Sequence, residues 1–99
     1  MPRFKWDPNP LPDDGTKRQK RNPYELDNGI VYHGEWDNDG LRDGKGTQYW
    51  PDGSIYVGYW LKDCAHGRGR LIHADLDYYE GDWLKDKAHG YGYYFHKAG

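Results

Sequence analysis

The stretch Tyr32-His-Gly34-Glu-Trp36 decides the fold, because it returns as Tyr56-Val-Gly58-Tyr-Trp60 and as Tyr79-Glu-Gly81-Asp-Trp83. A Gly-x-Gly pair follows each copy, at Gly44/Gly46, Gly67/Gly69 and Gly90/Gly92. The glycine pairs recur every 23 residues, and the first copy has one extra residue between its Trp and its glycine pair. A fixed period of this size indicates a repeat protein, in which each unit buries its apolar face against its neighbours.

The spacing inside each unit indicates β-strands. Tyr, Gly and Trp of each box stand two residues apart, so all three share one face of a strand. Short polar connectors such as Pro51-Asp52-Gly53-Ser54 have turn chemistry and join the strands as hairpins. At 74–77 the turn glycine is lost, and we expect either a looser turn or Asp75 in the left-handed region. The expected strands lie near residues 30–36, 44–50, 54–61, 67–73, 77–84 and 90–96.

These elements predict an all-β protein: an elongated, twisted, single-layer antiparallel meander of about three hairpin repeats. The sheet is expected over residues 24–99, with repeats near 32–55, 56–78 and 79–99, the last lacking its closing strand. The chain stops at Gly99, where the next box would begin. Either the sequence is part of a longer array, or its last strand is open to a partner.

Glycines in mid-strand weaken a strand unless something must approach the backbone there. Here they alternate with large aromatic side chains on the same face. We expect each ring to lie flat over a glycine of the adjacent strand, which makes the box residues structural. An Ala or Val at Gly46, Gly69 or Gly92 should therefore displace a ring and break the sheet locally.

These boxes resemble the MORN repeat, with its Tyr-x-Gly-x-Trp, polar turn, Gly-x-Gly and Asp-Gly turn, over residues 26–99. The resemblance implies an elongated sheet with one hairpin per repeat. It also implies a scaffold or dimerisation module, often of cytoskeletal or ciliary assemblies such as the radial spoke heads of axonemes. Other members are attached to phosphoinositide kinases, methyltransferases or junctional membrane proteins. The chain departs from the family pattern at the extra residue of the first repeat, at Leu76 and at His73.

Composition and charge indicate which classes of partner and which compartment fit this chain. The 35% hydrophobic content is low, but ten Tyr and five Trp supply large rings that hold a thin sheet together. Residues 24–99 hold eight Lys or Arg against thirteen acidic residues, which makes nucleic acid an improbable partner. The single cysteine fits a reducing compartment, and no run of residues is apolar enough to span a membrane. We expect a cytoplasmic protein, and by the resemblance a cytoskeletal or ciliary one.

Residues 1–23 are expected to form an extended, proline-rich, basic arm. Two interpretations stay open: a disordered tail, or an arm that orders on a partner. In the second, Phe4 and Trp6 are the apolar anchors, and the basic run meets an acidic surface. The basic residues of that run are Lys17, Arg18, Lys20 and Arg21.

The sequence offers no pattern for a metal, a cofactor or a catalytic residue. His66 and His89 occupy equivalent places in successive repeats, roughly 10 Å apart at two strands per repeat, which is too far to share a zinc ion. Cys64 falls in an expected turn and has no orienting group at a recognisable spacing. We therefore expect a protein that is not an enzyme and has no cofactor.

A last candidate surface lies on the face opposite the glycines. Strand alternation places Tyr91, Tyr93 and Phe95 there, either as a partner-binding stripe or as a simple cover for the sheet. The leading hypothesis is a structural scaffold that binds other proteins, with self-association through edge strands as one mode. The alternatives are a phospholipid-binding tether that uses the basic arm, and a regulatory domain of a larger enzyme.

Overall fold

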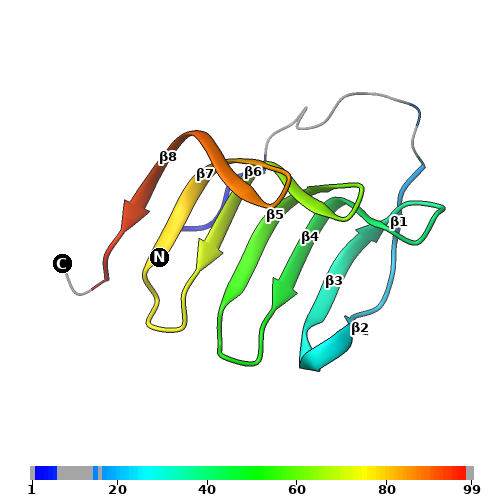
Figure 1. Ribbon diagram of the computed structural model, residues 1–99, viewed down its shortest axis with the longest axis horizontal. Helices are drawn as coiled ribbons and strands as arrows, with labels where there is room; N and C mark the ends of the chain where they lie inside the picture. The colour runs from blue at the N-terminus through cyan, green and yellow to red at the C-terminus, as the bar shows by residue number, and fades with distance from the viewer. Residues whose placement is uncertain (1, 7–14, 16, 98–99) are drawn as a thin grey trace.

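The protein is one open antiparallel β-sheet, as Figure 1 shows. The computed structural model describes residues 2–6, 15 and 17–97. Its sheet order is β1-β3-β4-β5-β6-β7-β8, and β2 also pairs with β3. The expected all-β meander of hairpin repeats is confirmed. The strands are β1 (Gln19–Lys20), β2 (Tyr24–Glu25), β3 (Val31–Trp36), β4 (Arg42–Tyr49), β5 (Ile55–Leu61), β6 (Cys64–Ile72), β7 (Tyr78–Leu84) and β8 (Lys87–Phe95), with a 3₁₀ turn η1 at Asp27–Gly29.

A row of glycines crosses the whole sheet and sets its register. The glycine of each Tyr-x-Gly-x-Trp box lies opposite the second glycine of the pair on each neighbouring strand. We call these six residues the glycine row: Gly34, Gly46, Gly58, Gly69, Gly81 and Gly92. Because every strand places a glycine at the same level, the backbone there is open to rings from the adjacent strands.

Each box tyrosine lies over the glycine row, as the sequence predicts. A Cβ at Gly46 would lie 2.5 Å from Cε1 and Cζ of Tyr32, and one at Gly69 would lie 2.6 Å from Cζ of Tyr56. Both rings are buried, and their hydroxyls donate to backbone carbonyls three residues along the chain. The tyrosine is therefore held flat by a contact that only glycine permits.

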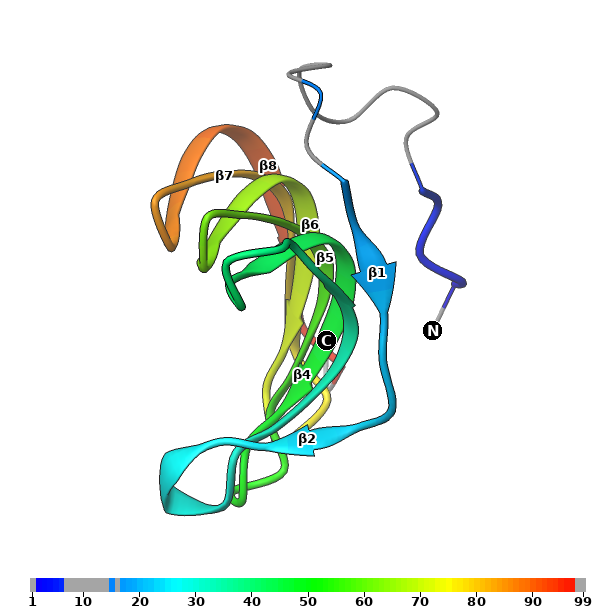
Figure 2. The ribbon, with the colours of Figure 1, turned by 90° about the vertical axis from the view of Figure 1, so that its right-hand side faces the viewer.

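The first glycine of each pair has a different role, which the sequence argument missed. Gly44, Gly67 and Gly90 have φ values of 101°, 75° and 72°, and the strand register shifts beside them in every repeat. These are bulges, which bend a strand and increase its twist. Figure 2 shows the resulting curvature, with one concave and one convex face.

The bulges also move the strand starts. The expected starts at 44, 67 and 90 are each wrong by two or three residues, since β4, β6 and β8 begin at Arg42, Cys64 and Lys87. Cys64 therefore lies at the start of a strand and not within a turn. A strict two-residue alternation stops at a bulge, so it could not place the residues before the glycine pair.

The hairpin turns use positive φ without glycine. Lys62 and Asp63 have φ values of 46° and 75°, and the equivalent Lys85 and Asp86 have 50° and 69°, as a two-residue type I′ turn requires. At the third junction the left-handed residue is Leu76, with φ 76°. Both expectations for that junction, a looser turn or Asp75 in the left-handed region, are wrong. The same backbone hydrogen bonds close this turn and the Gly53 turn, so the turn geometry overrides the residue preference.

The first repeat accommodates its extra residue in a longer loop closed by a buried carboxylate. Asp37 is almost fully buried and accepts hydrogen bonds from the backbone N–H groups of Asp39 and Leu41 and from Lys62 Nζ, at 2.9–3.0 Å. Burial alone would raise the pKa of Asp37, but these hydrogen bonds together hold it below its ordinary value. The buried carboxylate of Asp37 therefore stabilises the longer loop between Trp36 and Gly44.

Candidate protein-binding groove on the concave face

The concave face carries a continuous ladder of aromatic rings. Within each repeat the box Tyr and Trp meet edge to face, and each of the first two tyrosines also meets the Trp of the next repeat, with centroids 5.0–5.6 Å apart. The indole N–H groups of Trp60 and Trp83 donate to the carbonyls of Gly46 and Gly69. We call the six rings the aromatic ladder: Tyr32, Trp36, Tyr56, Trp60, Tyr79 and Trp83. It is both the core of the sheet and the floor of its concave surface.

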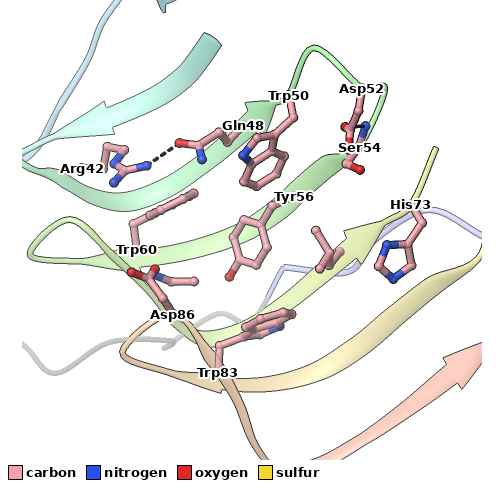
Figure 3. Close-up of a pocket in the computed structure, with 12 residues that line it drawn as sticks. Arg42, Gln48, Trp50, Asp52, Ser54, Tyr56, Trp60, His73, Trp83 and Asp86 are labelled. Carbon is pink, nitrogen blue, oxygen red and sulfur yellow. Dashed lines mark hydrogen bonds between the residues drawn. The ribbon is translucent and has the colours of Figure 1, made fainter. Parts of the chain in front are cut away.

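A groove of about 440 Å³ opens over this ladder, and residues of all three repeats line it. Its apolar floor includes Tyr56, Trp60, Leu71 and Trp83. Figure 3 shows the rings of Tyr56 and Trp60 on β5 and of Trp83 on β7 converging there. Trp50, Leu71 and Trp83 are only partly buried, so they present apolar surface to a ligand. An open apolar groove with a few polar groups is typical of binding sites.

Arg42 forms one wall of the groove and is fixed in place. Its guanidinium stacks 4.4 Å from the Trp60 ring centroid. It also donates to the Asp63 carboxylate at 2.7 Å, to the Asp63 carbonyl at 2.9 Å and to the Gln48 side chain. Because these bonds use its Nε, Nη1 and Nη2 atoms, Arg42 shapes the wall more than it attracts an anion.

Besides Arg42, the polar rim consists of the carboxylates Asp52 and Asp86 together with Gln48, Ser54 and His73. Asp52 and Asp86 lie at opposite ends of the groove (Figure 3). The hydrogen bond that Asp52 accepts from the Ser54 N–H lowers the pKa of this carboxyl, so it is charged at neutral pH. Since Arg42 is already paired, the free charge at the rim is negative and matches a basic ligand group.

Cys64 lies near this rim, but its environment suppresses reactivity. Burial, and then the charge of Asp86, raises the pKa of the thiol above its ordinary value. A thiol with a raised pKa stays protonated near neutral pH and is a poor nucleophile. Among the residues that the structure describes, no three His, Cys, Asp or Glu side chains lie close enough together to hold a metal ion.

The predicted aromatic anchors of the arm lie on the other face. Residues 2–6 cross the convex side of the sheet, as Figure 2 shows. Phe4 is only 7% exposed, and Trp6 meets Tyr59 edge to face at 5.1 Å. The guanidinium of Arg70 lies 5.9 Å from the Phe4 ring and donates to the Pro2 carbonyl at 2.5 Å. In this arrangement Phe4 and Trp6 bind their own sheet, so a partner would have to displace them.

The basic run does not form one cationic patch. Arg18 donates to the fully buried carboxylate of Asp43 at 2.6 Å, and Arg21 lies 5.9 Å from the Trp36 ring. Lys17 and Lys20 are exposed, and Lys20 belongs to β1 at the edge of the sheet. The run therefore divides between the sheet and the solvent, which leaves fewer charges for an anionic surface.

The third predicted surface lies on β8. Phe95 stacks on Tyr78 at 5.0 Å, and Tyr93 meets the same ring at 6.3 Å. Tyr91 is 90% exposed and projects beyond them. These three side chains lie together on the face away from the ladder, at the end of the sheet farthest from β1 and β2 (Figure 1).

Sequence reasoning missed two features. The first is that the aromatic ladder lines a groove, since the spacing of the boxes indicates only that these rings support the fold. The second is a buried ion pair on the convex face, where Arg70 Nη2 meets Glu80 Oε1 at 2.6 Å and both side chains are 5% exposed. The two residues face each other across β6 and β7, so the strand register would have revealed the pair.

Together these features define an open-sheet repeat protein, with one curved β-hairpin per repeat and an aromatic concave face. The sequence model of the MORN repeat matches residues 32–55, 56–78 and 79–97. The chain therefore belongs to the MORN-repeat family, whose repeats occur in scaffolds that contact proteins or membranes and form an interaction module rather than an enzyme family. No curated protein matches this chain. No helix among the described residues is long and apolar enough to cross a membrane.

Proposed function

We propose that this chain is a non-enzymatic scaffold module that binds a segment of another protein in the concave groove, within a larger assembly. The observation that carries the proposal is the groove over the aromatic ladder, where partly exposed Trp50, Leu71 and Trp83 lie between acidic ends. Rings of this type dominate protein interfaces because they bury a large area with little loss of side-chain freedom.

The groove chemistry suggests the kind of segment it takes. Apolar side chains would fill the floor, and a Lys or Arg at one end would meet Asp52 or Asp86. Residues 24–99 hold more acidic than basic residues, so their net negative charge also attracts a basic segment over longer distances. A cytoskeletal or axonemal setting is part of the proposal and rests on the family resemblance alone.

Two adjacent residues on β6 provide a matched test. Leu71 lines the groove, while Ile72 points to the convex face and pairs with Tyr78. A Leu71→Glu chain should lose the protein that co-purifies with the wild type, and an Ile72→Glu chain should retain it. Circular dichroism of both variants must show an intact sheet for the comparison to count.

A vesicle-binding experiment distinguishes this function from lipid binding. Vesicles containing phosphatidylserine should not retain the chain at physiological salt. Retention that disappears when Lys17, Arg18, Lys20 and Arg21 are neutralised would contradict the proposal and support a membrane tether. Equal loss of the protein partner in both β6 variants would place the binding site outside the groove.

A further inference from the structure

The convex face carries a second site, which residues 2–6 occupy (Figure 2). One face of a single-layer sheet is open to solvent unless something covers it. Tyr59, on the convex side of β5, is nevertheless only 1% exposed, and the Trp6 ring packs edge to face on it. Phe4 meets Trp6 edge to face at 4.9 Å and is itself buried, while Lys45 Nζ lies 5.5 Å from the Trp6 ring centroid. Two aromatic side chains, two residues apart, therefore anchor the segment.

The sheet fixes the polar groups of this site in place. Glu80 accepts hydrogen bonds from Arg70 Nε and from Arg68 Nη2, both at 2.6 Å. The Arg70 guanidinium also lies 4.6 Å from the Tyr78 ring centroid, and it donates to the carbonyl of Pro2. Every peptide has backbone carbonyls, so this contact does not depend on the sequence of the bound segment. We call the residues on the sheet side the arm site: Lys45, Tyr59, Arg68, Arg70 and Glu80.

Residues 2–6 are attached to the sheet without joining it. They form no strand, and no strand pairing of the sheet includes them. The contacts that hold them come from the Phe4 and Trp6 rings and from the Pro2 carbonyl. Their release would break no hydrogen bond between strands. Another segment of the same shape can therefore replace them while the sheet stays intact.

The segment and its site have the same sign of charge. Residues 2–6 include Arg3 and Lys5 but no acidic residue. The arm site holds three cations and one carboxylate, and two of the cations share that carboxylate. Like charges brought together oppose binding, and burial of the Arg70 charge beside Phe4 adds a desolvation cost. The chain's own segment therefore fits the shape of the site but not its charge.

The space beside Trp6 has room for acidic side chains. A pocket of about 450 Å³ opens there, and Lys20, His33 and Lys45 line it. The Glu35 carboxylate, which also lines this pocket, already accepts a hydrogen bond from the backbone N–H of Lys45 at 2.7 Å. Both lysine side chains are exposed, so a carboxylate of a bound segment would meet them next to its second ring.

We propose that the arm site binds an extended segment of another protein, with two aromatic residues two positions apart and acidic residues between and beside them. The two rings take the places of Phe4 and Trp6, and the carboxylates lie against the cations of the site. Residues 2–6 of the chain occupy the site until such a segment displaces them. Because the arm site and the concave groove lie on opposite faces of one sheet, one chain can hold both partners at once.

Two short synthetic peptides test the charge preference. One has the sequence of residues 2–6, Pro-Arg-Phe-Lys-Trp, and the other has glutamate in place of both basic residues. A Phe4→Ala/Trp6→Ala chain, whose own segment has lost its anchors, should bind the acidic peptide about tenfold more tightly at low ionic strength. The wild type should bind that peptide more weakly than this variant, because its own segment competes.

Two lysine substitutions in the Phe4→Ala/Trp6→Ala chain locate the site. Lys45→Glu should remove most of the preference for the acidic peptide, since Lys45 lies beside the second ring. Lys87→Glu is the matched control, because Lys87 is an exposed lysine on β8 and should leave the preference unchanged. Equal effects of the two substitutions would overturn the placement of the acidic segment on the arm site.

An Arg3→Glu/Lys5→Glu chain gives an independent measurement that keeps both rings. Its segment should dock more tightly, so this chain should have a higher Tm than the wild type, and high salt should reduce the difference. An unchanged or lower Tm would overturn the charge argument, as would equal affinity for the two peptides. A wild-type dimer that Phe4→Ala/Trp6→Ala abolishes would assign the site to a second copy. Tighter binding of a single-stranded oligonucleotide than of the acidic peptide would assign it to nucleic acid, and either result would overturn the proposal.

Discussion

Replacing Gly69 by alanine tests the ring-over-glycine contact at the centre of the sheet. The new Cβ would lie 2.6 Å from Cζ and 2.7 Å from Cε2 of Tyr56, well inside van der Waals contact. Tyr56 is almost fully buried and meets Trp60 and Trp83 at 5.1 and 5.4 Å. The ring therefore cannot tilt away without losing both aromatic contacts.

The expected loss follows from three terms. Forcing a methyl group into a packed core costs about 1–3 kcal/mol. Each weakened edge-to-face pair adds up to about 0.5–1.5 kcal/mol. Alanine also reduces the conformational entropy of the unfolded chain, which stabilises the folded state by about 0.4–1 kcal/mol. The net destabilisation is about 2–4 kcal/mol, equivalent to a Tm lower by roughly 10–25 °C for a domain of this size.

A double-mutant cycle isolates the contact, measured by urea unfolding at one low protein concentration. Tyr56→Leu removes the outer ring atoms that meet the new Cβ. In that background Gly69→Ala should cost nothing or stabilise slightly, which gives a coupling energy of about 2 kcal/mol or more. A cost of less than about 0.5 kcal/mol in the wild type, or the same cost in both backgrounds, would refute the reasoning.

Three further predictions concern the bulge, the convex face and the buried phenols. Gly90→Ala should cost about 1–2 kcal/mol of unfolding free energy through its positive φ, and Gly90→Asn less; equal costs in thermal melts would argue against a backbone cause. Glu80→Ala leaves the buried Arg70 without its counter-charge and should cost about 3–5 kcal/mol of unfolding free energy. A loss below about 1 kcal/mol would show that water solvates Arg70. Burial raises the pKa of Tyr32 and Tyr56 in the folded state, so the stability that they contribute is present below about pH 10 and is lost as the pH rises further. Near-ultraviolet absorbance should show both phenols ionising only as the sheet unfolds, and ionisation in an intact sheet would contradict their burial.

The repeat architecture could be predicted from the sequence because its signals are local and recur three times. The period of the boxes, the alternation within them and the turn residues all indicate hairpins, and the glycine beneath each tyrosine follows from strand alternation. The two glycines of each pair look alike in sequence, however. Only the φ angles and the register separate Gly67, which makes the bulge, from Gly69, which receives the ring.

The candidate site was less accessible to sequence reasoning. Curvature turns the shared face of the box residues into a groove, and curvature arises from bulges that the two-residue alternation does not contain. Contacts between distant segments, such as Phe4 with Arg70, depend on how residues 2–6 return to the sheet. In contrast, exposed Tyr91 and its neighbours could be found from alternation alone, since β8 is regular after its bulge.

Position-specific photo-cross-linking tests the central claim that the concave face binds a protein segment. A photoreactive phenylalanine analogue would replace Leu71 in the groove or Ile72 on the convex face, in otherwise identical chains. In extract from the native source, the probe at 71 should capture one discrete protein that the probe at 72 does not. Capture of that protein from position 72 alone, or equally from both positions, would contradict a binding site in the groove.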